Sequence, residues 1–150
     1  MVSYHEVGSQ TGFPALIPKG SHMSATSSTT ITDVRTIAVH VTEHDAAIAF
    51  YIDALGFEVR VDAQATPTMR WVEVGAPDAT VTIALVGGPV TGDVVETGIR
   101  FAVPDAEHER TRLIGHGVAV TDLLVWDGVP PMFSFDDPDG NRYVVVEEAR

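Results

Sequence analysis

The chain has 150 residues, of which 45% are hydrophobic and 20% are charged, and its formal net charge is −12. This excess of acidic side chains argues against a nucleic acid or an anionic membrane as partner, because phosphate binding draws on clustered lysine and arginine. The chain has no cysteine, which excludes disulfides, thiolate metal ligands and a cysteine nucleophile. No apolar run approaches the roughly 20 residues of a membrane-spanning helix, so we expect a cytoplasmic protein.

The N-terminal residues are interpreted as lying outside the folded domain. Residues 16–23 read LIPKGSHM, a sequence typical of a protease site followed by a cloning site, so residues 1–22 are assigned to an expression tag. Residues 23–33 are rich in serine and threonine and are expected to form a mobile lead-in, because such side chains build no core. A single domain is then predicted over residues 34–149.

The first half of this domain predicts a strand, a helix and three further strands. Residues 36–41 alternate, with Ile37, Val39 and Val41 on one face, as in a half-buried strand. Thr42 and Asp45 precede an amphipathic stretch that stops at Gly56, which predicts a helix over residues 45–55. Residues 57–61, 70–74 and 80–86 are predicted strands, separated by segments with proline, aspartate and glycine.

The second half repeats this order. It predicts a strand over residues 98–103, a helix that begins at Asp105, and strands over residues 118–124, 132–135 and 142–147. Gly117 stands 61 residues after Gly56, and the DPDG of residues 137–140 stands 61 residues after the APDA of residues 76–79. Two landmarks with one offset indicate an internal repeat. The predicted fold is α+β, with two tandem βαβββ modules at residues 34–87 and 95–148.

A βαβββ module covers only one face of its sheet with a helix. The other face needs a partner, so we expect two such faces to enclose a concave and largely apolar cleft. Clefts of this kind are the usual place for a small ligand.

Three segments carry a resemblance to a known family. Residues 49–57 (AFYIDALGF), 97–101 (TGIRF) and 135–141 (FDDPDGN) resemble the vicinal oxygen chelate superfamily of glyoxalases, extradiol dioxygenases and bleomycin-resistance proteins. The likeness covers nearly all of residues 34–147. It implies the glyoxalase/bleomycin-resistance fold, and it implies a homodimer, because members of this length commonly complete their clefts by pairing two chains.

The same resemblance implies where a metal would bind. Most enzymes of the superfamily hold a divalent ion through His, Glu or Gln on the first and last strands of each module. Those positions fall at Thr36, Ile83, Gly98 and Val144, and none of these residues is a strong ligand, since a divalent ion needs several converging imidazoles or carboxylates. We therefore expect no metal and no other cofactor.

Alternation along the strands places three polar side chains on the cleft face, namely His40, Arg100 and Arg142. His40 is a candidate general base or hydrogen-bond donor, with a purely structural place in the cleft wall as the alternative. Arg100 is a candidate clamp for a carboxylate, and its alternative is an ion pair with a neighbouring acid such as Glu73.

Aromatic and soft side chains form the other part of the predicted ligand site. Trp71, Trp126 and Met132 are expected to line the cleft and to offer a stacking surface for a flat molecule. Residues 125–131 are expected to form a loop at its rim. Phe133 and Phe135 alternate with Ser134 and are assigned to the core.

Three functions are compatible with these features. The favoured hypothesis is a metal-independent protein that binds a small molecule and sequesters an aromatic or cationic compound, as in resistance proteins. The alternative is a glyoxalase-like or dioxygenase-like enzyme, a lyase, isomerase or oxidoreductase, with a diverged active site in which His40 and Glu73 are the candidate catalytic residues. A third hypothesis is a structural or regulatory module that uses the cleft to dimerise.

Overall fold

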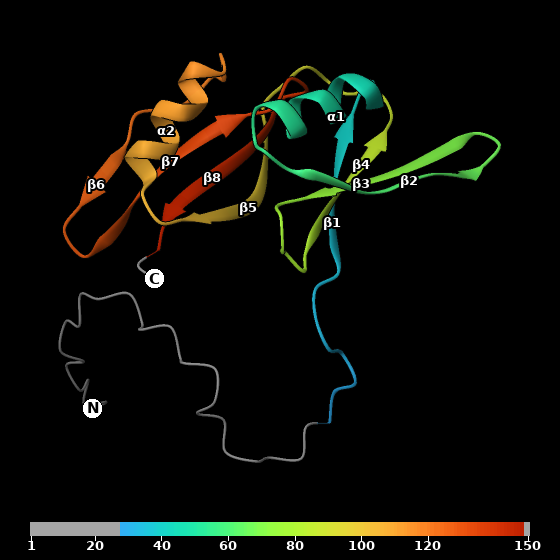
Figure 1. Ribbon diagram of the computed structural model, residues 1–150, viewed down its shortest axis with the longest axis horizontal. Helices are drawn as coiled ribbons and strands as arrows, with labels where there is room; N and C mark the ends of the chain where they lie inside the picture. Colours follow the sequence, from blue (N-terminus) through green and yellow to red (C-terminus); the bar gives the residue numbers. More distant parts are fainter. Residues whose placement is uncertain (1–27, 149–150) are drawn as a thin grey trace, which may run out of the picture.

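The computed structural model describes residues 28–148, so the predicted tag and the beginning of the predicted lead-in lie outside the described residues. The chain order is β1 (Thr36–Val41), α1 (His44–Asp53), β2 (Glu58–Thr66), β3 (Met69–Gly75), β4 (Thr82–Gly87), β5 (Val95–Val103), α2 (Ala106–Gly115), β6 (Leu124–Trp126), β7 (Val129–Asp136) and β8 (Asn141–Glu147). Both halves therefore have the predicted βαβββ order, and the fold is α+β (Figure 1).

Each module forms its own four-stranded sheet. The strand orders are β1-β4-β3-β2 and β5-β8-β7-β6. The first strand of each module runs parallel to the last, while the other neighbours are antiparallel. β1 and β5 consequently stand at a sheet edge, where one side of each backbone has no strand neighbour among the described residues.

A side chain caps the N-terminus of each helix, and a glycine follows each C-terminus. Glu43, rather than the predicted Thr42 and Asp45, caps α1, because its carboxylate accepts the backbone N–H groups of residues 45 and 46. Asp105 caps α2 as predicted, by accepting the backbone N–H of residue 108. Gly56 and Gly117 follow the two helices with φ of 71° and 76°, a conformation that favours glycine.

One part of the second module differs from the prediction. The strand expected at residues 118–124 is replaced by β6 at Leu124–Trp126, and only an isolated bridge from Val120 to Phe135 precedes it. The expected rim loop at residues 125–131 is instead part of a β6–β7 hairpin, with Gly128 at φ 77° in its turn. An Asp-Gly pair suits such a tight turn, but two adjacent prolines made this stretch look unlike a strand.

The core lies on the helix-covered face of each sheet. In the first module it includes Val39, Val41, Tyr51, Val72, Val74 and Leu85, and in the second Ile99, Leu113, Phe133, Phe135, Tyr143 and Val145. Phe133 and Phe135 are thus in the core, as predicted. Aromatic rings join the two modules, with Phe57 against Phe101 at 5.5 Å between centroids and Tyr51 against Tyr143 at 6.3 Å.

A buried polar cluster also holds the modules together, and we call Tyr51, Asp137, Asn141 and Tyr143 the intermodule clamp. The Tyr51 hydroxyl donates to Asp137 at 2.8 Å and also contacts the Tyr143 hydroxyl. The Asn141 amide donates to Asp137 and to the main-chain oxygen of His40, both at 2.8 Å. Burial raises the pKa of Tyr51 far above its ordinary range, so this hydroxyl keeps its proton and remains a donor.

Replacing Tyr51 by phenylalanine should destabilise the domain more than replacing Tyr143. The change Tyr51→Phe leaves the buried Asp137 without one donor, which should lower the free energy of unfolding by about 1–3 kcal/mol. Tyr143→Phe removes only the contact between hydroxyls and should lower it by about 0.5–1.5 kcal/mol. Urea unfolding of both variants measures the difference, and equal losses would contradict the role given to the clamp.

Candidate functional site

The face of the first sheet that lies opposite α1 carries one group of the predicted site residues. On β1 this face presents Thr36, Ala38 and His40, because Val39 and Val41 point to the core. The register sets Ala38 beside Ala84 of β4, and Ala84 beside Glu73 of β3. We call this surface the first helix-free face. Ala38 and His40 are exposed on it.

The register corrects one of the four positions at which the resemblance implied metal ligands. Ile83 pairs with Ile37 and is buried on the helix-covered face, so it does not share a face with Thr36. In the second module Arg100 pairs with Val144, just as Ala38 pairs with Ala84 in the first. The first-module counterpart of Val144 is therefore Ala84. The slip arose because the offset of 61 was applied to the last strand of each module, whereas the strand register gives an offset of 60 between Ala84 and Val144.

The corrected position has no metal-binding side chain either. Ala84 offers no donor atom, and Gly98 offers none in the second module. In the part of the chain that the structure describes, no three His, Asp or Glu residues gather where they could hold a metal ion. The metal-free state itself stays a prediction.

Glu73 is the most enclosed polar group of the first helix-free face. Its side chain is only 4% exposed, and it accepts hydrogen bonds from Trp71 Nε1 and Thr82 Oγ1, both at 2.8 Å. Arg35 Nη2 lies 3.5 Å from its Oε1. The hydrogen bond from Trp71, with that from Thr82 and the charge of Arg35, holds the pKa of Glu73 below its ordinary value despite burial. The face thus carries a carboxylate next to an indole ring.

His40 lies on the same face, held through its backbone. Its main-chain oxygen accepts the Asn141 amide. Two residues further on, both the main-chain N–H and the hydroxyl of Thr42 donate to Asp139, at 2.9 and 2.6 Å. The turn of residues 137–141 therefore fixes the end of β1. The imidazole makes no hydrogen bond or ion pair within residues 28–148 and is free to meet a ligand.

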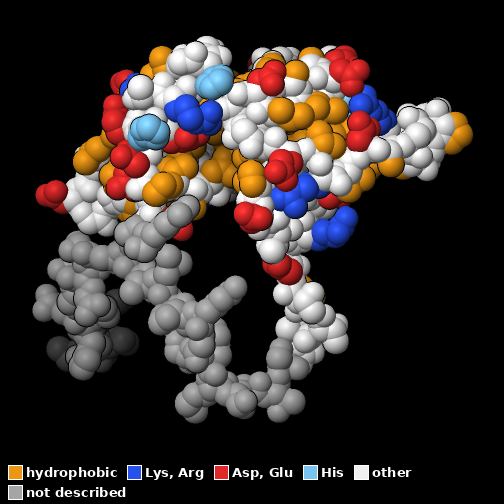
Figure 2. All heavy atoms as spheres, in the orientation of Figure 1, with side chains coloured by type: hydrophobic (Ala, Val, Ile, Leu, Met, Phe, Trp, Pro, Cys, Tyr) orange, Lys and Arg blue, Asp and Glu red, His pale blue; other side chains and the backbone are white. Residues whose placement is uncertain are grey.

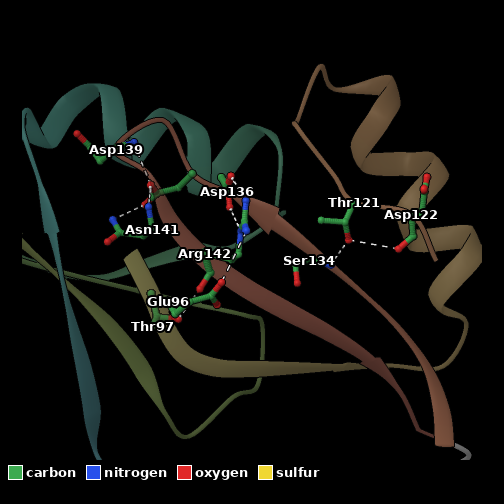
Figure 3. A network of polar contacts seen from close by, with 10 residues as sticks. Glu96, Thr97, Thr121, Asp122, Ser134, Asp136, Asp139, Asn141 and Arg142 are labelled. Atoms are coloured by element: carbon green, nitrogen blue, oxygen red, sulfur yellow. Dashed lines mark hydrogen bonds and ion pairs between the residues drawn. The ribbon is translucent and has the colours of Figure 1, made fainter. Parts of the chain in front are cut away.

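The remaining predicted residues belong to the second sheet. Arg100 is exposed on β5, and the alternative that it pairs with Glu73 is wrong, because Arg35 occupies that place. Arg142 on β8 is bound to Asp136 at 2.7 and 2.9 Å, with Glu96 at 3.7 Å (Figure 3). The hydrogen bond to Asp136 raises the pKa of Arg142. Two of the five N–H donors of Arg142 are thus already used in hydrogen bonds to Asp136.

Trp126 and Met132 stand on the β6–β7 hairpin. Trp126 is 64% exposed at the end of β6, and Met132 is half-buried opposite Leu124 and Val146. The predicted site residues therefore form two groups. His40, Trp71 and Glu73 lie on the first sheet and Arg100, Trp126, Met132 and Arg142 on the second, and no hydrogen bond or ion pair joins the groups within residues 28–148.

A cavity of about 860 Å³ lies between the modules on their helix-covered side. Its apolar walls include Ile37, Leu55, Phe57, Ile83, Phe101 and Val145, and Glu109 and Arg112 of α2 also line it. These two form an ion pair at 2.6 Å. Arg100 is the one predicted site residue in its lining. The sequence did not indicate this cavity, because each of its walls reads as ordinary core and only the docking of the modules leaves space between them.

The surface is strongly acidic but not uniformly polar. Hydrophobic side chains are visible between the acidic ones in Figure 2. Over residues 28–148, neither helix has the length and apolar character that crossing a bilayer requires.

Comparisons with known proteins agree with this geometry. The model of the Glyoxalase/Bleomycin resistance protein/Dioxygenase superfamily matches residues 34–145. A superfamily member from Sphaerobacter thermophilus has 31% identity and a TM-score of 0.73, over 79% of this chain and 98% of that one. TnmS3, an antibiotic binding protein from Streptomyces sp. CB03234, has 25% identity and a TM-score of 0.70, over 81% and 99%. No curated protein matches the chain.

Acid should remove the stabilisation that ionised Glu73 contributes. Its pKa is lower in the folded than in the unfolded chain, where it is about 4.3. The unfolded chain therefore binds the proton first as the pH falls, so this contribution is complete above about pH 4.3 and is lost as the pH falls through the folded-state pKa. Urea unfolding between pH 7 and pH 3 should show a weaker acid dependence for Glu73→Gln than for the parent. Glu148→Gln, at an exposed site, is the control, and an unchanged profile in Glu73→Gln would contradict the assignment.

Proposed function

This chain belongs to the glyoxalase/bleomycin resistance protein/dioxygenase superfamily, and from that premise we propose that it binds a small aromatic or cationic molecule without a metal ion. The pairing of Trp71 with the buried carboxylate of Glu73 on the first helix-free face carries this proposal. An indole and a carboxylate side by side suit a ligand that has both an apolar body and a positive charge. The printed description of TnmS3 as an antibiotic binding protein, at 25% identity, supports the same class of function.

The metal-independent part of the proposal rests on side-chain chemistry. The positions Thr36, Ala84, Gly98 and Val144 offer neither imidazole nor carboxylate. Chemistry that polarises two neighbouring oxygens of a substrate needs such ligands around an ion. Sequestration needs only a surface with a few placed polar groups. On the first helix-free face these groups are His40, Trp71 and Glu73.

We propose that the working unit is a homodimer. His40 and Trp71 lie on one sheet while Arg100, Trp126, Met132 and Arg142 lie on the other, so a ligand that meets both groups needs the two helix-free faces to be brought together. A second copy would cover these faces and would also pair the free edges of β1 and β5, and uncovered strand edges favour such pairing. A cytoplasmic location and a small molecule as the partner belong to this proposal.

An enzyme is the second candidate function. The observation in its favour is the exposed imidazole of His40, which lies on the same face as the ionised Glu73. An imidazole nitrogen can take or give a proton. Under this hypothesis the protein is a glyoxalase-like or dioxygenase-like enzyme in which His40 transfers a proton and Glu73 assists it.

A thermal-shift panel of aromatic amines and cationic aromatic antibiotics tests the binding function. At least one compound should raise the melting temperature by several degrees, since saturation at about 100 times Kd stabilises a protein by about 2.7 kcal/mol. Dialysis against EDTA should leave the shift unchanged, and Trp71→Ala should remove most of it. Val103→Ala, in the lining of the helix-side cavity, is the matched control and should bind as the parent does.

Three outcomes would overturn parts of this proposal. About one tightly held divalent ion per chain in elemental analysis would exclude metal independence. A panel without any shift would exclude sequestration of this ligand class. Conversion of a compound to product, abolished by His40→Ala while binding persists, would favour the enzyme.

The dimer is tested separately. Sedimentation equilibrium of the parent should give twice the chain mass of 16.0 kDa. Ala102→Arg should shift the mass toward the monomer, because Ala102 is exposed on the edge strand β5 and a large cation there would clash with the second copy. Thr111→Arg, on the exposed surface of α2, should stay dimeric. A parent protein that sediments as a monomer would exclude the proposed dimer.

A further inference from the structure

We propose that Glu73 is the anchor for an ammonium group of the ligand and that Arg35 is a built-in counter-ion which the ligand displaces. The inference rests on the proposed binding function and names the ligand class more narrowly. The ligand has a protonated or quaternary amine attached to an aromatic body. Arg35 then competes with it for the same carboxylate.

Glu73 has the features of a charge anchor. Its side chain is buried, but it lies on the first helix-free face rather than in the hydrophobic core. Trp71 and Thr82 donate one hydrogen bond to each of its oxygens, and a carboxylate can accept about four. The two donors hold the carboxylate in place and leave part of its acceptor capacity unused. A buried charge is costly without a cationic partner, so this capacity favours a cation.

Arg35 supplies that cation only weakly. Its side chain is 77% exposed and its guanidinium reaches Glu73 at 3.5 Å through a single nitrogen. Water and salt screen the charge of such an exposed guanidinium. The Arg35 backbone is fixed separately, because its carbonyl accepts the Thr82 backbone N–H at 3.1 Å. The guanidinium can therefore swing out into solvent without moving the strand.

The residues around Glu73 suit a ligand of this class. Ala84 and Ala38 continue the cross-strand row that begins at Glu73, and both side chains are small. Trp71, two residues from Glu73 on the same strand, is half-buried and offers an indole ring to a cation or to an aromatic group. His40 lies two residues beyond Ala38 on the same face. The net charge of −12 further favours the approach of a cation.

The alternative is that Arg35 is a permanent structural partner of Glu73. In that case removing Arg35 would expose an uncompensated carboxylate and disturb the face. The displacement model makes the opposite prediction, since removing a competitor strengthens binding of the ligand. The sign of the change in affinity therefore separates the two.

The test compares 2-phenylethylamine, which is protonated at pH 7, with the nearly isosteric neutral 2-phenylethanol. Titrations are followed in the parent protein by the indole N–H resonances, because the chain has only two tryptophans and Trp126→Phe assigns them. The amine should shift the Trp71 resonance and bind more tightly than the alcohol. Added salt should weaken binding of the amine and leave binding of the alcohol unchanged.

Arg35→Ala should then increase the affinity for the amine about 1.5- to 5-fold, and Glu73→Gln should reduce it more than about tenfold. Neither change should alter the affinity for the alcohol by more than about twofold. Arg110→Ala in the second module makes the same change in net charge and should leave both affinities as in the parent. Arg35 is exposed, so its variant tests the proposal even where Glu73→Gln fails to fold.

Unchanged or weaker amine binding in Arg35→Ala would overturn the displacement model. Equal binding of amine and alcohol by the parent would overturn the anchor while leaving the binding function intact. If neither probe binds and the wider panel also gives no shift, the proposed function fails together with this inference.

Discussion

The buried carboxyl group of Asp137 is the interaction on which the rest of the arrangement depends. It accepts the Tyr51 hydroxyl, the Asn141 amide and the backbone N–H groups of residues 139 and 141. Tyr51 comes from the first module and the others from the second, so one side chain couples a helix to a turn 86 residues away. The buried polar cluster of the clamp is fully bonded among the described residues, and a satisfied network of this kind specifies one docking geometry.

That docking decides which surfaces remain open. Because Phe57 packs against Phe101 and Tyr51 against Tyr143, the modules meet through their helix-covered sides. The face with His40 is therefore turned outward in the single chain, whereas Arg100 also lines the cavity between the modules. The helix-side cavity and the helix-free faces are two consequences of the same contact. A cleft between the two helix-free faces would require the second copy that we propose, while the cavity lies within the single chain.

Strand alternation and the glycine stops predicted most of the fold from the sequence, since both depend on local chemistry. Val39 and Val41 had to share a face, and Gly56 and Gly117 had to end the helices. Register is not local. The position equivalent to Val144 became Ala84 only once the strand pairing was known. The partner of Glu73 likewise depended on tertiary structure. Neither charge nor sequence spacing distinguished Arg35, just before β1, from Arg100 on β5, and only the fold places Arg35 beside Glu73.

The duplication explains what the two modules share and where they differ. In the first module one cross-strand row reads Ala38, Ala84 and Glu73, and in the second the equivalent row reads Arg100, Val144 and Ser134. The three positions of each row are equivalent in the backbone, but the side chains differ. The first row ends in the carboxylate of Glu73, whereas the second begins with the guanidinium of Arg100. The repeated backbone thus sets equivalent positions in the two modules, while the side chains at those positions determine their chemistry. A row of two alanines before a single carboxylate offers one donor group where a metal ion needs several, and it agrees with the organic cation that we propose as the ligand.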